Sequence, residues 1–166
     1  MREALLAEFD HEMATTRRML ERVPEAHLSW KPHPKSMSLQ VLVSHLVNIP
    51  TWLPPTLEQS FIDMAPVGEA PITTPQQTSR DQWMQTFDTN VANARASLAA
   101  LEAPKLAELW SLKAGEKIFF TLPKGAVLRS FIFNHLIHHR AQLGVYLRLL
   151  DVPLPSVYGP TADEAM

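Results

Sequence analysis

Apolar side chains recur every three or four residues along four separate stretches of this chain, a periodicity typical of amphipathic helices. In the first stretch, Leu5, Phe9, Met13 and Leu20 fall on one helical face. The spacing predicts four helices, over residues 2–22, 39–57, 80–101 and 127–151. Four such helices in a chain of 166 residues predict an all-α fold, a four-helix bundle formed by a single domain over residues 1–166.

Prolines and capping residues mark the predicted helix ends. Pro24 follows the first helix, and Pro153 follows the fourth. Ser38 is a candidate N-cap for the second helix, and the sequence "SRDQ" from Ser79 resembles a capping box before the third. Three further prolines fall inside the second helix, where each removes a hydrogen bond and is expected to kink the axis. These are Pro50, Pro54 and Pro55.

The segment between the third and fourth helices has a different character. Its sequence "LWSLKAGEKIFFTLPKG" mixes aromatic and β-branched residues with glycines. This composition predicts a short, irregular hairpin inserted between helices three and four.

Charge and composition exclude several classes of function. Fifteen basic and seventeen acidic residues give a net charge of -2, which argues against nucleic acid and acidic membranes as partners. The chain has no cysteine, so disulfides, thiolate metal sites and cysteine nucleophiles are excluded, and any thiol must come from outside. The start "MREALLAEFD" is not an apolar signal sequence, and no run of about 18 apolar residues occurs. We therefore expect a cytoplasmic protein whose partners are small molecules or proteins.

Histidines interrupt the apolar face of the fourth predicted helix. At about 100° per residue, an arc of about 80° collects the residues expected to face the core. They are Leu128, Ile132, His135, His139, Gln142 and Tyr146. His135 and His139 lie one turn apart, on the order of 6 Å along the axis, and are close enough to share an ion. His138 projects about 100° away from His139 and is expected to border the site.

A third histidine faces inward from the second helix. His45 falls among apolar residues such as Val41, Leu42 and Trp52, and is therefore predicted to be buried. Three neutral imidazoles can hold a divalent ion and leave coordination positions for water or substrate. The other histidines, His11, His27 and His33, look like surface residues.

A purely structural interpretation stands beside this one. A histidine on an apolar face is often a core residue whose hydrogen bonds are satisfied. Trp52 and Trp30 can equally be core anchors, and Gln142 and Tyr146 can be polar residues near the end of the bundle. In the functional interpretation, substrate is bound by residues around the histidines. The candidates are Trp52, His138, Gln142 and Tyr146.

Several motifs together resemble the DNA-damage-inducible DinB family. They are the W-x-P loop at Trp30 and Pro32, the histidine at His45, the run H-x-x-x-H-R-x-Q from His135 to Gln142, and the tail "YGPTADE". The resemblance covers nearly the whole chain and implies a four-helix bundle with a metal held by His45, His135 and His139. Ala141 stands where the family often has glycine, a change that a helix tolerates.

The resemblance implies a metal site more firmly than a reaction. Relatives include transferases that add low-molecular-weight thiols to electrophiles, a thiol-dependent isomerase and proteins described as hydrolases. We expect a divalent ion, zinc or nickel, with iron and copper as alternatives. In the first hypothesis the ion lowers the pKa of a thiol cosubstrate, which then attacks an electrophile. The alternatives are a metal-dependent hydrolase and a non-catalytic protein that binds a metal or small molecule. No side chain is assigned as an acid or base.

A homodimer is also expected. Phe133, Ile137 and Gly144 lie roughly opposite the histidines, where a simple bundle would expose polar residues. Either the segment 109–124 covers them within the chain, or a second copy does so through a two-fold contact. Dimers are common in the resembled family, which favours the second arrangement and places Ile137 at the interface.

Overall fold

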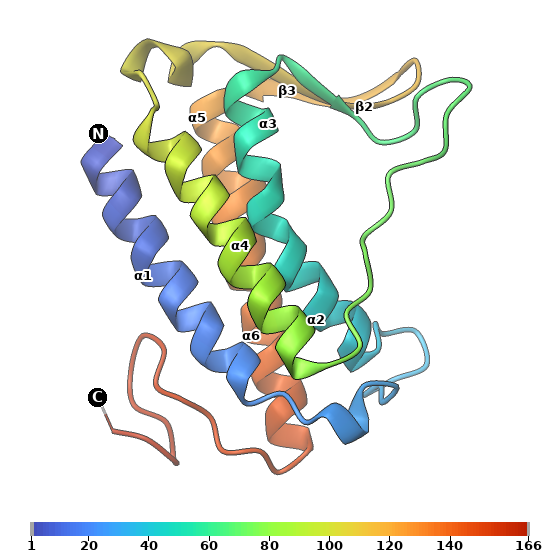
Figure 1. Ribbon diagram of the computed structural model, residues 1–166, viewed down its shortest axis with the longest axis vertical. Helices are drawn as coiled ribbons and strands as arrows, with labels where there is room; N and C mark the ends of the chain where they lie inside the picture. Colours follow the sequence, from blue (N-terminus) through green and yellow to red (C-terminus); the bar gives the residue numbers. More distant parts are fainter. Residues whose placement is uncertain (1, 166) are drawn as a thin grey trace.

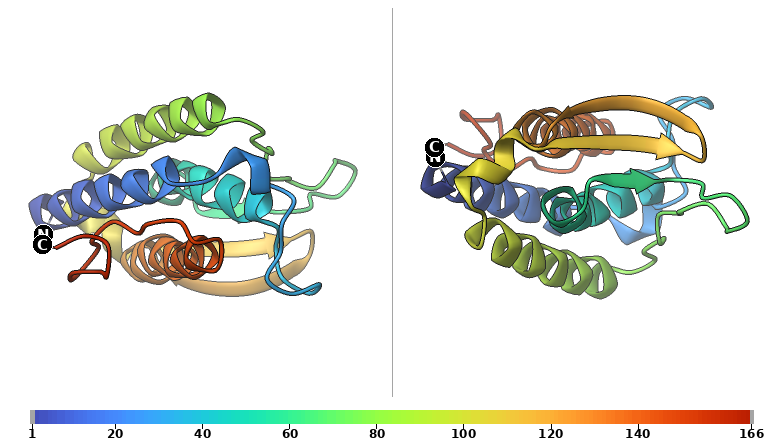
Figure 2. Two further views of the ribbon diagram at one scale, coloured as in Figure 1. Left: turned by 90° about the horizontal axis from the view of Figure 1, so that it is seen from below. Right: turned by 90° about the horizontal axis from the view of Figure 1, so that it is seen from above.

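Four long helical segments run side by side along the longest dimension of the protein, and a small sheet crosses one end (Figure 1). The structure is a computed structural model that describes residues 2–165. The first helical segment is α1 (Arg2–Glu21), and the third is α4 (Arg80–Ala99). The second consists of α2 (Leu39–Asn48), η2 (Ile49–Trp52) and α3 (Leu53–Glu58) in succession. The fourth consists of α5 (Lys124–Val127), η4 (Leu128–Phe133) and α6 (Asn134–Leu149). The end views show that α1 and the α2–α3 segment each lie between α4 and α6 (Figure 2). The predicted four-helix arrangement is confirmed.

The second predicted helix is built from three consecutive pieces because of its prolines. A 3₁₀ segment, η2, separates α2 from α3. Pro50 lies in the first turn of η2, and Pro54 and Pro55 lie in the first turn of α3. A proline is tolerated there because the amide hydrogens of a first turn have no partner within the helix.

The fourth predicted helix contains a π-helical stretch. η4 has i to i+5 hydrogen bonding over Leu128–Phe133, between α5 and α6. The wider turn changes the angular position of Phe131 and the residues before it relative to α6. Angular positions calculated at a constant 100° per residue therefore do not hold for residues on the two sides of this stretch.

The protein is not strictly all-α, because three strands form a sheet in the order β1-β2-β3. The strands are β1 (Phe61–Asp63), β2 (Leu109–Ala114) and β3 (Lys117–Pro123). β2 and β3 form the predicted antiparallel hairpin. β1 pairs with β2 in parallel, with Phe61 opposite Ser111. Sequence analysis missed β1 because three residues are too few to show an alternating pattern.

Ser38 and Ser79 act as the predicted helix caps. Each hydroxyl accepts a hydrogen bond from the backbone N–H three residues later, at Val41 and Gln82 respectively. The Gln82 side chain accepts from the N–H and the hydroxyl of Thr78, so the reciprocal bond of the predicted capping box is displaced by one residue.

The C-terminal tail, residues 150–165, folds back along α1 and α6 (Figure 2). Three arginines hold it through ionic or hydrogen-bonded contacts. Arg140 donates to the Tyr158 hydroxyl, Arg148 pairs with Asp163, and Arg18 pairs with Glu164. The motif "YGPTADE" thus supplies the partners that dock the tail on the helices.

The side of α6 opposite the histidines is covered within the same chain, but not by the segment named in the sequence analysis. Phe133 is fully buried and packs edge-on against Phe9 of α1, with ring centroids 6.2 Å apart. A Cβ at Gly144 would lie 3.4 Å from the Met19 side chain. These contacts from α1 remove the sequence argument that a second copy must cover this face. Within residues 2–165, no helix is both long and apolar enough to span a membrane.

Candidate metal centre

Three histidines from two helices converge at the contact between α2 and α6. His45 comes from α2, and His135 and His139 come from successive turns of α6. The ring centroids of His45 and His139 lie 4.4 Å apart, and those of His135 and His139 lie 4.6 Å apart. One nitrogen from each ring lies within 4.8 Å of the other two. The sequence analysis selected the same three residues, and the structure brings them together.

The ring nitrogens lie close to the arrangement that a shared divalent ion needs. The Nε2 atoms of His45 and His135 are 2.8 Å apart, so one imidazole donates to a neutral neighbour. Bonds of 2.0–2.1 Å to a tetrahedral ion would place two nitrogens about 3.4 Å apart. The donor set therefore fits a divalent ion that favours imidazole, through modest side-chain adjustments.

Gln142 sets the orientation of the third imidazole. Its Oε1 lies 2.7 Å from Nδ1 of His139. A carboxamide oxygen only accepts, so Nδ1 carries the proton and the Nε2 lone pair remains available to an ion. Such a partner fixes both the tautomer and the ring plane of a metal-binding histidine. The structure thus places Gln142 behind a candidate ligand.

Burial keeps the three imidazoles neutral. The pKa of His45 and that of His135 are each lowered to about 4, mainly by burial and in part by the neighbouring histidines. Burial also lowers the pKa of His139, against the hydrogen bond with Gln142, which raises it. Neutral imidazole is the form that binds metal, so the cluster is ready for an ion near neutral pH.

The cluster lies at the edge of the core and not at its centre. His45 and His135 are only half-buried, whereas His139 is 7% exposed. The fully buried face of α6 is instead formed by Leu136, Leu143 and Leu147. The prediction that His45 is buried is therefore wrong in degree. The predicted histidine arc does face the core over most of its length, since four of its six residues are buried: Leu128, Ile132, His139 and Tyr146. An edge position leaves the cluster accessible to a small molecule.

Aromatic rings form a wall on one side of the cluster. The Trp52 ring lies edge-on to His45 and to His135, with centroid distances of 5.6 and 5.3 Å. It also stacks on Phe131, 5.0 Å away, and Phe131 in turn contacts Phe120 of β3. Phe131 and Phe120 were not selected from the sequence, because neither the π-helical turn nor the contact between that turn and the hairpin leaves a sequence pattern.

The other predicted binding residues lie at different distances from the cluster. His138 is exposed beside His139, with ring centroids 4.9 Å apart, as expected for a residue that borders the site. The Tyr146 hydroxyl donates to the Met37 carbonyl, and its ring packs edge-on against Trp30. These contacts anchor the loop before α2 and match the structural interpretation of Tyr146 and Trp30.

Among residues 2–165, the histidine cluster includes no carboxylate. Structural zinc sites are usually closed by four protein ligands, whereas catalytic sites use three and leave a position open. The arrangement can therefore hold an ion and leave coordination positions for a small molecule.

Comparisons with known proteins agree with the fold and the motifs. Residues 1–165 match the model of the DinB family. The uncharacterized protein YrdA of Bacillus subtilis is 25% identical over 162 residues, which cover 96% of this chain and 89% of that protein. A DinB-like protein from Bacillus cereus has a similar fold, with a TM-score of 0.69, 21% identity and coverage of 94% and 97% of the two chains. The DinB-like protein YjoA from Bacillus subtilis has a TM-score of 0.70 and 20% sequence identity, and the similarity covers 93% of this chain and 97% of that chain.

Proposed function

This chain belongs to the DinB family, and we propose that it is a metal-dependent enzyme that transfers a low-molecular-weight thiol to an electrophile. One observation carries the proposal. Three neutral imidazoles converge at a half-buried edge of the bundle, without a carboxylate among the described residues of the cluster. His45, His135 and His139 would hold the ion.

A divalent ion at this cluster would act as a Lewis acid that lowers the pKa of a bound thiol or water. The thiol must be a cosubstrate, because the chain contains no cysteine. In the transfer, the cosubstrate loses its S–H proton, its sulfur bonds to an electrophilic carbon, and the proton passes to the product or leaving group. Gln142 would keep His139 in the binding tautomer, and the Trp52 wall would exclude water.

Hydrolysis is the second candidate, and it requires a group that accepts a proton from water. No carboxylate joins the histidines within residues 2–165, and His138 is the neighbouring titratable side chain that the structure places beside them. A non-catalytic metal-binding role is the third candidate. Three protein ligands support it less well than a closed set of four would.

The metal site is tested by comparing two adjacent histidines. His139→Ala removes a proposed ligand and should abolish most metal binding, whereas His138→Ala should leave the metal content unchanged. Both proteins are purified under identical conditions, loaded with zinc or nickel, and assayed by elemental analysis. Equal metal content in wild type and the His139 variant would contradict the proposed ligand set.

The thiol reaction is tested on cobalt-substituted protein. A small thiol that reaches the ion should change the visible absorption of cobalt, because sulfur coordination alters its ligand field. If several thiols leave the spectrum unchanged although cobalt is bound, thiol transfer is contradicted while the metal site stands.

A further inference from the structure

We propose that the cavity beside the Trp52 wall binds the apolar part of the substrate, and that this substrate is an uncharged small molecule with one hydrogen-bond donor at its end. The inference rests on the proposed function of the histidine cluster. It is carried by the position of the cavity, its aromatic wall, and the way its polar groups are already paired.

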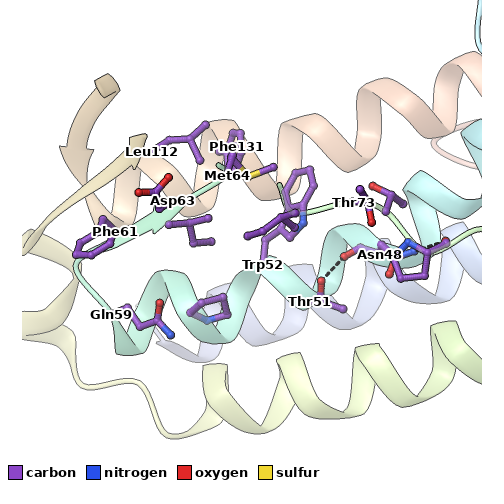
Figure 3. Close-up of a pocket in the computed structure, with 15 residues that line it drawn as sticks. Asn48, Thr51, Trp52, Gln59, Phe61, Asp63, Met64, Thr73, Leu112 and Phe131 are labelled. Carbon is purple, nitrogen blue, oxygen red and sulfur yellow. Dashed lines mark hydrogen bonds between the residues drawn. The ribbon is translucent and has the colours of Figure 1, made fainter. Parts of the chain in front are cut away.

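The cavity is large enough for a small organic molecule. Its volume is about 500 Å³, within the usual range for ligand sites. Figure 3 shows its lining, with Trp52 between an end that contains Phe61, Leu112 and Phe131 and an end that contains Asn48 and Thr73. The α2–α3 segment, β1 and the segment that follows it line the space, together with Leu112 of β2 and Phe131 of η4.

The cavity and the histidine cluster share one wall. Trp52 and Phe131 both line the cavity, and both contact the His135 ring, at centroid distances of 5.3 and 5.8 Å. None of the three histidines lines the cavity itself. A molecule that fills the cavity therefore touches the same two side chains that pack on a proposed metal ligand.

Charge at the cavity wall is already compensated. Asp63 is the one ionisable residue in the lining. Its carboxylate accepts from the N–H groups of Gly115 and Ala65, and Lys113 lies 3.2 Å away. The Gly115 hydrogen bond is the main cause of the lowered pKa of Asp63. Because burying an unpaired charge is costly, the lining favours an uncharged ligand.

The polar end of the cavity offers hydrogen-bond acceptors. The side-chain amide of Asn48 donates hydrogen bonds to the backbone carbonyls of Ser44 and Pro75. Its side-chain oxygen can therefore accept a hydrogen bond from a ligand. The Thr51 hydroxyl donates to the backbone carbonyl of Asn48, 2.7 Å away. The Thr51 hydroxyl oxygen can still accept a hydrogen bond. A ligand with a hydroxyl or N–H group at this end would match both oxygens.

Two fluorescent probes with the same ring skeleton test the ligand class. N-phenylnaphthylamine is uncharged and carries one N–H donor, whereas anilinonaphthalenesulfonate adds an anionic group. We expect the metal-loaded wild type to bind the uncharged probe at least about tenfold more tightly, a difference of about 1.4 kcal/mol. Equal or tighter binding of the sulfonate would overturn the assignment.

Cavity-filling variants locate the binding. Ile62→Trp should weaken binding of the uncharged probe by about tenfold or more. Thr73→Trp, in the segment that follows β1, is the second variant if the first does not fold. Thr89→Trp adds the same side chain at an exposed position of α4 outside the cavity and should bind as the wild type does. If all variants bind alike, the probe does not occupy this cavity.

Metal content and cobalt absorption, measured on the same samples, separate this inference from the proposed function. Absence of bound metal in the wild type contradicts the metal site and leaves only a ligand cavity. Bound metal without probe binding contradicts the cavity. Probe binding should also shift the cobalt spectrum, because Trp52 touches both sites; no shift would overturn the role of the cavity ligand as substrate.

Discussion

Adjacent residues of one helical turn have different tasks in this protein. His139 faces the other two histidines, whereas Arg140 points about 100° away into a buried network with Glu12 and Thr16. Gln142 lies almost one turn later and returns to the His139 ring. The motif H-R-x-Q therefore combines a candidate metal ligand, a structural ion pair and the residue that orients the ligand.

Gln142 should control metal affinity without touching the ion. Gln142→Leu keeps the size of the side chain but removes the acceptor for Nδ1 of His139, so the ring loses its fixed tautomer. Loss of such a partner typically weakens metal binding by about 10- to 100-fold. Competition with a chromogenic chelator measures the change. Gln85→Leu, at an exposed position of α4, is the matched control and should bind metal normally.

The metal-free protein should lose stability as the pH falls from about 6.5 to about 4. In this window unfolded histidine is protonated, whereas folded His45 and His135, with pKa values of about 4, remain neutral. The unfolded state therefore binds more protons. The free energy of unfolding falls by at most about 1.4 kcal/mol per pH unit for each ring, and by less where solvent screens a half-buried ring.

Urea unfolding between pH 4 and 7 checks this dependence. The double variant His45→Gln with His135→Gln removes both titrating rings and should show a clearly shallower slope over the same window. An unchanged slope would show that these histidines do not have lowered pKa values.

At the scale of elements, the site depends on how two helices meet and on an irregular turn before one of them. α2 supplies one histidine and α6 supplies two, so the cluster exists only where these helices pack. η4 then brings Phe131 against Trp52. A regular helix over residues 124–149 would place Phe131 at a different angle relative to His135, and the wall between cluster and cavity would change.

The stability of the fold should depend on one buried ion pair, whose two side chains both bond to the hydroxyl of Tyr158 in the tail. Arg140 and Glu12 are 2% and 4% exposed, and their charged groups lie 2.6 Å apart. Arg140→Met leaves the Glu12 charge buried without its partner, which typically costs about 3–5 kcal/mol. Urea unfolding gives the loss. Arg129→Met, which breaks the exposed pair with Glu8, should cost less than about 1 kcal/mol.

A double variant separates the charge effect from lost packing. Glu12→Leu combined with Arg140→Met removes both charges and should recover most of the stability that Arg140→Met loses. If the double variant is as unstable as the single one, the ion pair is not the source of the loss.

At the scale of the whole molecule, the expected homodimer needs a different surface from the one that the sequence indicated. Ile137 is half-buried and borders a small cavity together with Met19 and Leu154 of the same chain. Ile137→Glu should therefore loosen the packing of the tail. Val145 and Leu149 lie one turn apart on α6 and are 59% and 58% exposed, so they are the better candidates for a two-fold contact.

We predict that light scattering at micromolar concentration gives about twice the chain mass of 18.7 kDa. Replacing Val145 and Leu149 together by glutamate should yield a monomer that retains its metal, because both side chains are exposed and lie at least six residues beyond His139, about 9 Å or more along the helix axis. A wild-type mass near 18.7 kDa would contradict the dimer.

The sequence by itself determined the helices, their caps and the three histidines. Helical periodicity and capping are local, so Ser38, Ser79 and the spacing of His135 and His139 carry their meaning without the rest of the chain. The resemblance to a known family pointed to the same histidines. The β2–β3 hairpin was also within reach, because its two strands are neighbours in sequence.

Only the tertiary structure decided the features that depend on distant contacts. β1 exists because three residues pair with β2, about fifty positions later, and such pairing leaves no local pattern. The half-burial of His45 follows from where α2 meets α6, and the cover over Phe133 comes from Phe9 at the other end of the chain. A helical wheel gives the direction of a side chain, but the partner helix decides how deeply that side chain is buried.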